Sequence, residues 1–265
     1  MDIWKGLGGG LVFRAYSGYP INETIGSDYN GDGTNNDRPY TGIHDLTRPI
    51  VMDATVEQYD GYRFVYVLPF GMDKVFVEDT YYSDKPDLDR RVMVQRIAAY
   101  ADGKGWQVER VLREETGVLP VVMGGDLENY WASGSGRTAK AGARGAFFHA
   151  VTSYSLPDAV RNAIYISELP DFDGDRLNML MRQRAQEHWK GGNFYRILNR
   201  MLFRASEPGQ RYKILERFYR LKPGLIERFY AGQTTGGDKA RILSGKPPVP
   251  IGKALQAIRA RKKKR

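Results

Sequence analysis

The chain has 265 residues, of which 42% are hydrophobic, so it is long enough to bury a core in one large domain or two modest ones. It contains no cysteine, which excludes disulfide bonds and thiolate metal sites. The formal net charge is +9 and is unevenly spread: residues 176–265 hold 23 Lys and Arg against 5 Asp and Glu, and residues 1–175 hold 17 against 26.

Two glycine-containing stretches in the first 45 residues resemble ligand-binding loops. GLGGG at residues 6–10 follows no predicted strand and misses the GxGxxG spacing, so we do not predict a dinucleotide loop there. Asp28, Asn30 and Asp32 are spaced as at the start of a calcium loop, but the twelfth position is Pro39 instead of a bidentate glutamate. We interpret this stretch as a polar turn, with weak Ca²⁺ binding as the alternative.

The next stretch has the pattern of three strands in a meander. β-branched and aromatic residues fill residues 50–58, 62–69 and 74–82, and Asp60-Gly61 and residues 71–73 separate them. Because side chains alternate along a strand, one face of the second strand carries Tyr62, Phe64 and Tyr66.

Glu78 is expected to lie among apolar and aromatic neighbours. The same alternation places Phe76, Glu78 and Thr80 on one face of the third strand and turns Asp79 to the other. A carboxyl group that loses its hydration has a raised pKa and can stay protonated at neutral pH. Glu78 is therefore a candidate general acid, and a solvent-exposed glutamate at a strand edge is the alternative interpretation.

The remaining sequence is predicted to be mostly helical, with no run of about 18 apolar residues for a membrane span and no apolar leader for a signal peptide. In chain order we expect a helix over 84–105 with Pro86 in its first turn, strands over 106–113 and 118–123, an irregular segment over 129–145, a helix over 156–169, and helices from 177 until a last one from 251. The basic C-terminal third suggests an anionic partner, either lipid headgroups or nucleic acid.

Eight segments carry a recognisable pattern: RPIVMDATVEQYDGYRFVYVLPF (48–70), VFVEDTYYSD (75–84), REETGVLP (113–120), FHAVTSYSLPDAV (148–160), FYRILNRMLF (194–203), ERFYRL (216–221), LIERFYAG (225–232) and DKARILSGKPPVP (238–250). In this order they resemble the bacterial lycopene β-cyclases of carotenoid biosynthesis, over residues 46–257. The resemblance implies an intramolecular lyase (isomerase) that adds a proton to lycopene and closes its end groups to β-rings.

The resemblance also implies roles for individual residues. The family's acidic motif corresponds to VFVEDT, so Glu78 is implied as the catalytic acid and Asp79 as the second candidate. Aromatic faces can stabilise a carbocation by about 0.5–2 kcal/mol each. The expected substrate-lining residues are Tyr62, Phe64, Tyr66, Phe76 and Thr80.

The family uses reduced FAD in a redox-neutral reaction, with NAD(P)H as the source of electrons. Its N-terminal GxGxxG unit has no counterpart here, which predicts that this chain alone binds no flavin and is colourless. The flavin contacts implied for this sequence are Gly125, Asp126, His149, Thr152, Ser153, Tyr154 and Ser155. Ala150 and Ser153 stand where the family has proline and glycine, which is expected to disturb the approach of the backbone to the flavin, and for His149 we favour a structural role.

Together these inferences predict an α/β fold: the C-terminal part of a hydroxylase-like FAD/NAD(P)-binding flavoprotein, with a β-meander substrate domain, a helical C-terminal region and no N-terminal dinucleotide-binding lobe. Residues 13–40 resemble a strand-loop passage of TonB-dependent outer-membrane receptors. We therefore expect a foreign, poorly ordered arm over 1–45, a substrate and flavin-contact region over 46–175 and a basic helical region over 176–265.

The expected function is that of a lycopene β-cyclase, in a truncated or inactive form. The alternative is a non-enzymatic basic remnant that binds a lipid surface or nucleic acid. Since lycopene is dissolved in the bilayer, the basic region is expected to meet membrane lipid, and the expected location is cytoplasmic and peripheral to the membrane.

Overall fold

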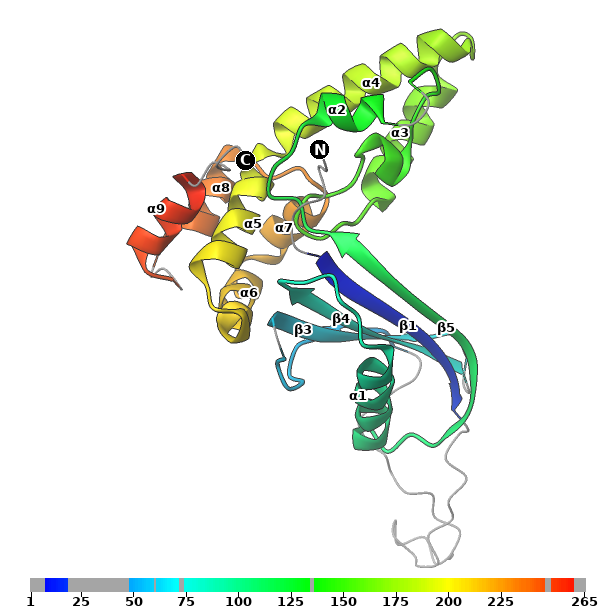
Figure 1. Ribbon diagram of the computed structural model, residues 1–265, viewed down its shortest axis with the longest axis vertical. Coiled ribbons are helices and arrows are strands. Elements are labelled where there is room, and N and C mark those ends of the chain that lie inside the picture. Colours follow the sequence, from blue (N-terminus) through cyan, green and yellow to red (C-terminus); the bar gives the residue numbers. More distant parts are fainter. Residues whose placement is uncertain are drawn as a thin grey trace, which may run out of the picture. The chain divides into compact units, whose positions relative to one another are not determined.

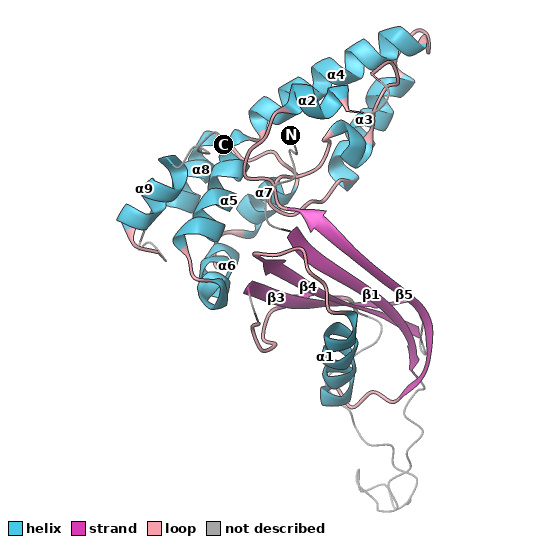
Figure 2. Cartoon of the chain, viewed as in Figure 1, coloured by secondary structure: helices cyan, strands magenta, loops and turns pink. Residues whose placement is uncertain are grey.

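The computed structural model describes residues 8–18, 48–59, 61–71, 74–133, 136–245 and 249–259 (Figures 1 and 2). The chain divides into two compact units, one comprising Gly9–Val118 and the other Met1–Gly8 with Leu119–Arg265. The three segments expected from the sequence, 1–45, 46–175 and 176–265, stay a prediction of domain organisation.

A five-stranded sheet forms the centre of the Gly9–Val118 unit, in the order β2-β3-β4-β1-β5. Its strands are β1 (Gly8–Gly18), β2 (Ile50–Asp53), β3 (Gly61–Pro69), β4 (Lys74–Ser83) and β5 (Val108–Pro120). β2, β3 and β4 pair antiparallel in sequence order, which confirms the meander. Helix α1 (Arg90–Gly103) covers one face of this sheet (Figure 1). The core between them consists of Val65, Val67, Val75, Val77, Tyr81, Met93, Ile97 and Tyr100.

The first strand of the meander is shorter than predicted. β2 ends at Asp53, because Met52 has a φ of 66° and the pairing with β3 shifts register between Ile50 and Asp53. The Gln58 side chain then replaces the backbone ladder: its Oε1 accepts a hydrogen bond from the Arg63 amide at 3.0 Å, and its Nε2 donates one to the Arg63 carbonyl at 2.8 Å. The alternation of side chains along a strand does not predict that a side chain takes the place of backbone hydrogen bonds.

The helix that follows the meander begins later than predicted. Asp89 accepts hydrogen bonds from the backbone N–H groups of Arg91 and Val92 at 3.0 and 3.2 Å, and this cap starts α1 at Arg90. Pro86 therefore lies before the helix instead of in its first turn.

Two further boundaries differ from the prediction. The strands expected over 106–113 and 118–123 are one strand, β5, because Gly117 lies within it instead of turning the chain. The segment expected to be irregular contains a helix, α2 (Leu127–Ala132), and a 3₁₀ turn at Gly142–Gly145.

Residues 8–18, which we expected to be poorly ordered, form β1. This strand pairs antiparallel with β4, from Gly9 opposite Tyr82 to Ser17 opposite Lys74. β4 supplies the backbone partners that an isolated strand would lack, and the foreign, poorly ordered arm over 1–45 stays a prediction. The possible calcium loop at residues 28–39 lies outside the described residues.

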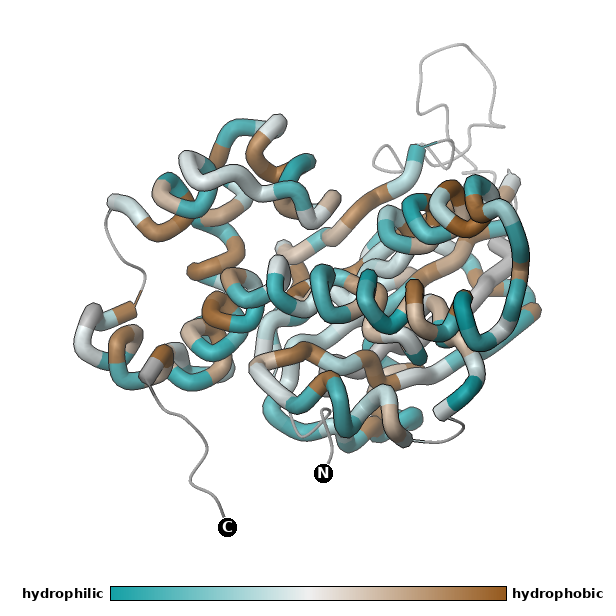
Figure 3. Tube along the Cα trace, turned by 90° about the horizontal axis from the view of Figure 1, so that it is seen from above, coloured by the Kyte–Doolittle hydropathy of each residue, from teal (hydrophilic) through white to brown (hydrophobic). Residues whose placement is uncertain are grey.

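The second unit is helical, which confirms the pattern predicted for the C-terminal region. Beyond α2, its helices are α3 (Leu156–Ser167), α4 (Gly174–Gly191), α5 (Asn193–Ala205), α6 (Arg211–Tyr219), α7 (Pro223–Tyr230), α8 (Gly236–Leu243) and α9 (Ile251–Arg259). Hydrophobic and hydrophilic residues alternate along these helices (Figure 3). α5 packs against α9 through a small core that includes Met201, Ala205, Ala254 and Ala257. Within the described ranges, no helix is both long and apolar enough to cross a bilayer.

Candidate active site

The register of β3 and β4 places Glu78 directly opposite Tyr66. The pairs Phe64–Thr80 and Tyr62–Tyr82 continue along the strands with the same spacing of two residues. The predicted alternation is therefore confirmed: the even-numbered residues of both strands share one face, and the core against α1 is built from odd-numbered residues of β3 and β4.

The even-numbered side chains form what we call the aromatic face: Tyr62, Phe64, Tyr66, Phe76, Glu78, Thr80 and Tyr82. The Phe64 ring meets the Tyr66 ring edge to face, with centroids 5.2 Å apart, and lies 5.2 Å from the Tyr62 ring. Tyr82 adds a third contact at 5.9 Å from Tyr62. We did not predict Tyr82, although its even number continues the 76, 78, 80 series, which is the signal that would have found it.

Glu78 is buried on this face, with 6% of its surface exposed. Burial raises the pKa of Glu78 from 4.5 to about 7, against the opposing effect of the Thr80 hydroxyl, which donates a hydrogen bond to Oε1 at 2.7 Å. The carboxyl group is thus close to half protonated at neutral pH. A solvent-exposed glutamate at a strand edge, the alternative interpretation, is wrong.

Asp79 lies on the opposite face and is held in an ion pair. Arg63 donates from Nε and Nη2 to its two carboxylate oxygens at 2.8 and 3.0 Å, and the Tyr81 hydroxyl donates to it at 2.6 Å. Burial raises the pKa of Asp79 in spite of Arg63. Burial alone would lower the pKa of Arg63, but the bonds to Asp79 raise it overall. Both pKa values are therefore raised, which disfavours the charged form of Asp79 and favours the charged form of Arg63.

The residues expected to contact a flavin lie in the other unit, where residues 149–155 form a closed loop before α3. The His149 N–H donates to the Tyr154 carbonyl, and the Ser153 N–H donates to the His149 carbonyl, both at 2.8 Å. Ser153 has a φ of 60°, a conformation that favours glycine, and its hydroxyl donates to the Pro120 carbonyl at 2.6 Å.

His149 is buried at the start of this loop, and the centre of its ring lies 4.2 Å from that of Tyr195 and 5.0 Å from that of Phe229. Its Nδ1 accepts hydrogen bonds from the amides of Val151 and Thr152, both at 3.3 Å, so the ring proton is on Nε2. Burial lowers the pKa of His149 to about 4, which makes the ring neutral at pH 7. Its Nε2 is buried without a hydrogen-bond partner among the described residues, and the structural role that we favoured stays a prediction.

Gly125 and Asp126 lie at the start of α2. Gly125 has a φ of 154°, and Asp126 caps the helix by accepting hydrogen bonds from the backbone and side-chain nitrogens of Asn129 at 3.1 and 2.9 Å. The chain just before them is tied to the 149–155 loop, because Asn199 Nδ2 donates to the carbonyls of Val122 and Ala150 at 2.8 and 2.7 Å.

A buried, protonatable carboxyl group on an aromatic sheet face defines an acid site suited to an apolar, electron-rich substrate. The sequence profile of the family described as lycopene cyclase protein matches residues 38–256. The chain belongs to this family.

Three curated relatives carry the same description, lycopene beta-cyclase. The protein of Pseudescherichia vulneris is 47% identical over 217 residues, which is 82% of this chain and 56% of the relative. That of Pantoea ananas is 46% identical over 215 residues, covering 81% of this chain, and that of Paracoccus sp. (strain N81106 / MBIC 01143) is 44% identical over 223 residues, covering 84%. The chain spans about half the length of these relatives, 56% in each case.

Proposed function

We propose that this chain supplies the proton donor of a lycopene β-cyclase, an intramolecular lyase (isomerase) of carotenoid biosynthesis. It would act together with the half of the relatives that this sequence does not span. The observation that carries the proposal is the burial of Glu78 on the aromatic face, with a pKa raised to about 7. A group with this pKa can be protonated at working pH and still transfer its proton.

The proposed reaction needs an acid, a dry site and a way to stabilise positive charge. The carboxyl proton of Glu78 forms a C–H bond with one carbon of a terminal double bond of lycopene, which leaves a tertiary carbocation. The electron pair of a neighbouring double bond closes the ring, and a proton leaves from an adjacent carbon to restore a double bond. One proton enters and one leaves, so the product is an isomer of the substrate.

Residues around Glu78 have supporting parts in this scheme. Thr80 donates its hydrogen bond to Oε1, which leaves Oε2 as the oxygen that carries the acidic proton. Tyr62 and Phe64 are almost fully buried, which keeps water from competing for the proton and for the carbocation. Their ring faces can offset the charge by about 0.5–2 kcal/mol each.

For the assembled enzyme we propose reduced FAD, kept reduced by NAD(P)H, within a hydroxylase-like flavoprotein fold. The resemblance of residues 148–160 supports this cofactor, and the residues that would hold it are Gly125, Asp126, His149, Thr152, Ser153, Tyr154 and Ser155. The start of α3 supports this choice, because Ser155 forms no side-chain cap for the backbone N–H groups of Leu156 and Asp158, although Pro157 between them has no N–H to offer. When bound, the flavin would stabilise the positive charge of the transition state.

A chimera tests the proposed function. The N-terminal half of the Pantoea ananas relative, joined to residues 46–265, should convert lycopene to β-ring products in bacteria that accumulate lycopene. Product is measured by chromatography, with the intact relative as the positive control. A chimera that folds, binds flavin and leaves lycopene unchanged would contradict the proposal.

A second proposal concerns a lipid surface. Leu156, Val160 and Ile164 recur at every fourth residue of α3 and are 73%, 50% and 54% exposed, so they form an uncovered apolar stripe on the described helix. An apolar helix face combined with basic charge is typical of a segment that lies in the membrane interface. We propose that this stripe and the basic C-terminal region contact anionic lipid, and this observation favours lipid over nucleic acid.

Vesicle sedimentation checks this surface. The chain should pellet with anionic vesicles. Binding should weaken as salt is added, because the electrostatic screening length shortens to roughly 10 Å at 0.1 M. The triple variant Leu156→Ser, Val160→Ser, Ile164→Ser should reduce binding. Removal of residues 259–265 should also reduce it, since each basic residue is worth about 1 kcal/mol near such a surface. Leu243→Ser, which changes a leucine on α8 that is 51% exposed, is the control. Complete displacement of the vesicles by nucleic acid would favour the alternative.

A further inference from the structure

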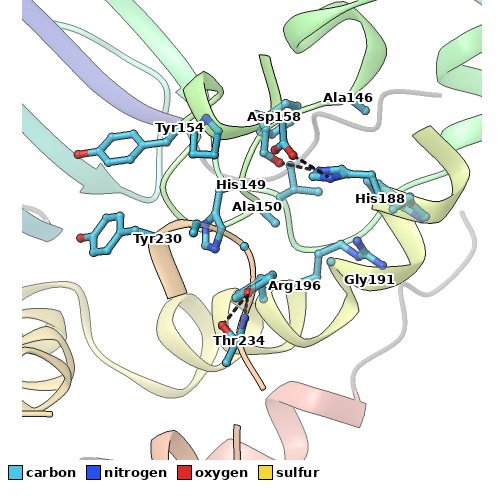
Figure 4. Close-up of a pocket in the computed structure, with 18 of the residues that line it drawn as sticks. Ala146, His149, Ala150, Tyr154, Asp158, His188, Gly191, Arg196, Tyr230 and Thr234 are labelled. Carbon is cyan, nitrogen blue, oxygen red and sulfur yellow. Dashed lines mark hydrogen bonds and ion pairs between the residues drawn. The ribbon is translucent and has the colours of Figure 1, made fainter. Parts of the chain in front are cut away.

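The second unit contains a cavity of about 290 Å³ that the proposed acid chemistry does not use. Its wall combines the 149–155 loop with residues of α3, α4, α5, α7 and the start of α8, and all of these belong to one compact unit (Figure 4). Three cationic side chains contribute to the wall: Arg161 from α3, which is paired with Asp158, Arg196 from α5 and Lys239 from α8.

Arg196 is an unusual lining residue because it is buried and has no anionic partner. Only 7% of its surface is exposed, and its guanidinium group stacks 4.1 Å from the centre of the Trp189 ring. Among the residues that the structure describes, no carboxylate or carbonyl accepts a hydrogen bond from it. A buried charge without a partner is strongly unfavourable, so such arginines are expected to meet an anion.

The other charged groups of the wall are already paired with one another. Asp158 accepts a hydrogen bond from Arg161 at 3.0 Å and lies 3.6 Å from His188 Nδ1. Asp238, which precedes Lys239, is bound by two nitrogens of Arg228 at 2.7 and 2.8 Å. The nearby carboxylates are therefore engaged, and the excess charge of the cavity is positive.

The electrostatics of α5 also favour a bound anion. Burial lowers the pKa of Arg196 to about 10, and the positive charge of Arg200 one turn further along lowers it too. A bound anion would reverse both effects, because it would neutralise the guanidinium group inside the cavity.

We propose that this cavity binds a phosphate group, with Arg196 as its principal ligand and Lys239 as a second cation. A guanidinium group offers two parallel N–H donors that match phosphate or carboxylate oxygens. Two cations match the charge of a phosphate, about −1.5 to −2 at neutral pH, better than the single charge of a carboxylate. The cavity shares His149 and Tyr154 with the residues proposed to hold the flavin, but the phosphate inference is argued from Arg196 and Lys239 and does not rest on the proposed function.

Calorimetric titration of the purified chain with inorganic phosphate tests the site, at constant ionic strength set with chloride. We expect one phosphate per chain, and Arg196→Gln should weaken binding about tenfold or more, the effect of losing one or more hydrogen bonds to a charged group. Arg196→Lys should weaken it less, and Lys239→Gln should also weaken it. Lys190→Gln, which removes an exposed charge at the end of α4 outside the cavity wall, is the matched control and should bind as the wild type does.

The melting temperature gives an independent readout. Phosphate should raise it in the wild type more than in Arg196→Gln, because ligand binding stabilises only the form that binds. Dihexanoyl phosphatidic acid and glycerol phosphate, titrated in parallel, show whether a lipid headgroup or a soluble phosphate ester fits better.

Three results would overturn the proposal: no binding of phosphate, equal binding by Arg196→Gln, or acetate binding as tightly as phosphate. If Arg196→Gln does not fold, phosphate binding by Arg196→Lys and Lys239→Gln decides, and wild-type affinity in both overturns it.

Discussion

Glu78→Gln in the chimera should reduce the formation of β-rings by about 10²–10⁴-fold, the usual contribution of a positioned general acid. Glutamine keeps the shape of the side chain and can still accept a hydrogen bond from Thr80, so the aromatic face should keep its packing. It has no acidic proton to give to a double bond. Loss of rings with unchanged fold therefore isolates the proton transfer.

Two controls keep this result specific. Asp79→Asn should retain ring formation per folded molecule, because Asp79 lies on the other face within its ion pair with Arg63. Glu109→Gln removes an exposed carboxyl group of β5 and should leave the rate unchanged. Rings formed at a wild-type rate by Glu78→Gln would remove the acid assignment.

Breaking the Arg63–Asp79 pair should cost about 3–5 kcal/mol of the free energy of unfolding, because the remaining charge would be buried without compensation. Arg63→Met leaves Asp79 fully buried with only the Tyr81 hydroxyl as a hydrogen-bond donor among the contacts that the structure records for it. Urea unfolding of the purified chain measures the change.

The double variant Arg63→Met, Asp79→Leu should recover most of that loss, since two apolar side chains need no charge partner. As a control, Arg220→Met breaks an exposed pair with Glu216 on α6 and should change stability by less than about 1 kcal/mol. A loss of similar size in Arg63→Met and Arg220→Met would show that burial does not govern the Arg63–Asp79 interaction.

Period-two patterning was enough to predict which face of the sheet carries Glu78, whereas its role as the acid was implied by the family resemblance. The meander of β2, β3 and β4 has short turns and one aromatic face, so the faces of Glu78 and Asp79 follow from counting residues. The ion-pair partner of Asp79 could not be predicted by counting residues. Arg63 faces Tyr81 across the ladder and reaches Asp79 diagonally, which depends on the length and rotamer of the arginine side chain.

Long-range contacts explain the other differences. β5 stays extended through Gly117 as the outer neighbour of β1 in the sheet, and local sequence alone favours a break there. Arg196 looked like one of several arginines on a basic helix, and only the packing of α5 against the 149–155 loop and α8 shows it to be buried. What marks Arg196 as a candidate ligand is its burial without an anionic partner, and this cannot be read from the sequence.

The raised pKa of Glu78 makes the free energy of unfolding depend on pH. Its pKa in the folded chain, about 7, is above the value of 4.5 expected when unfolded. Glu78 therefore contributes stability that is fully present below about pH 4.5 and is lost as the pH rises through about 7. Glu78→Gln should remove this pH dependence.

A carbon-13 NMR titration of the glutamate side-chain carboxyl groups tests most directly whether Glu78 is held as an acid. The Glu78 signal is identified by its absence from the Glu78→Gln spectrum of the same chain. We expect its chemical shift to titrate with a midpoint near pH 7, well above the ordinary value of 4.5. A midpoint near 4.5 would show an ordinary ionised carboxylate at neutral pH and would contradict the assignment of Glu78 as the proton donor.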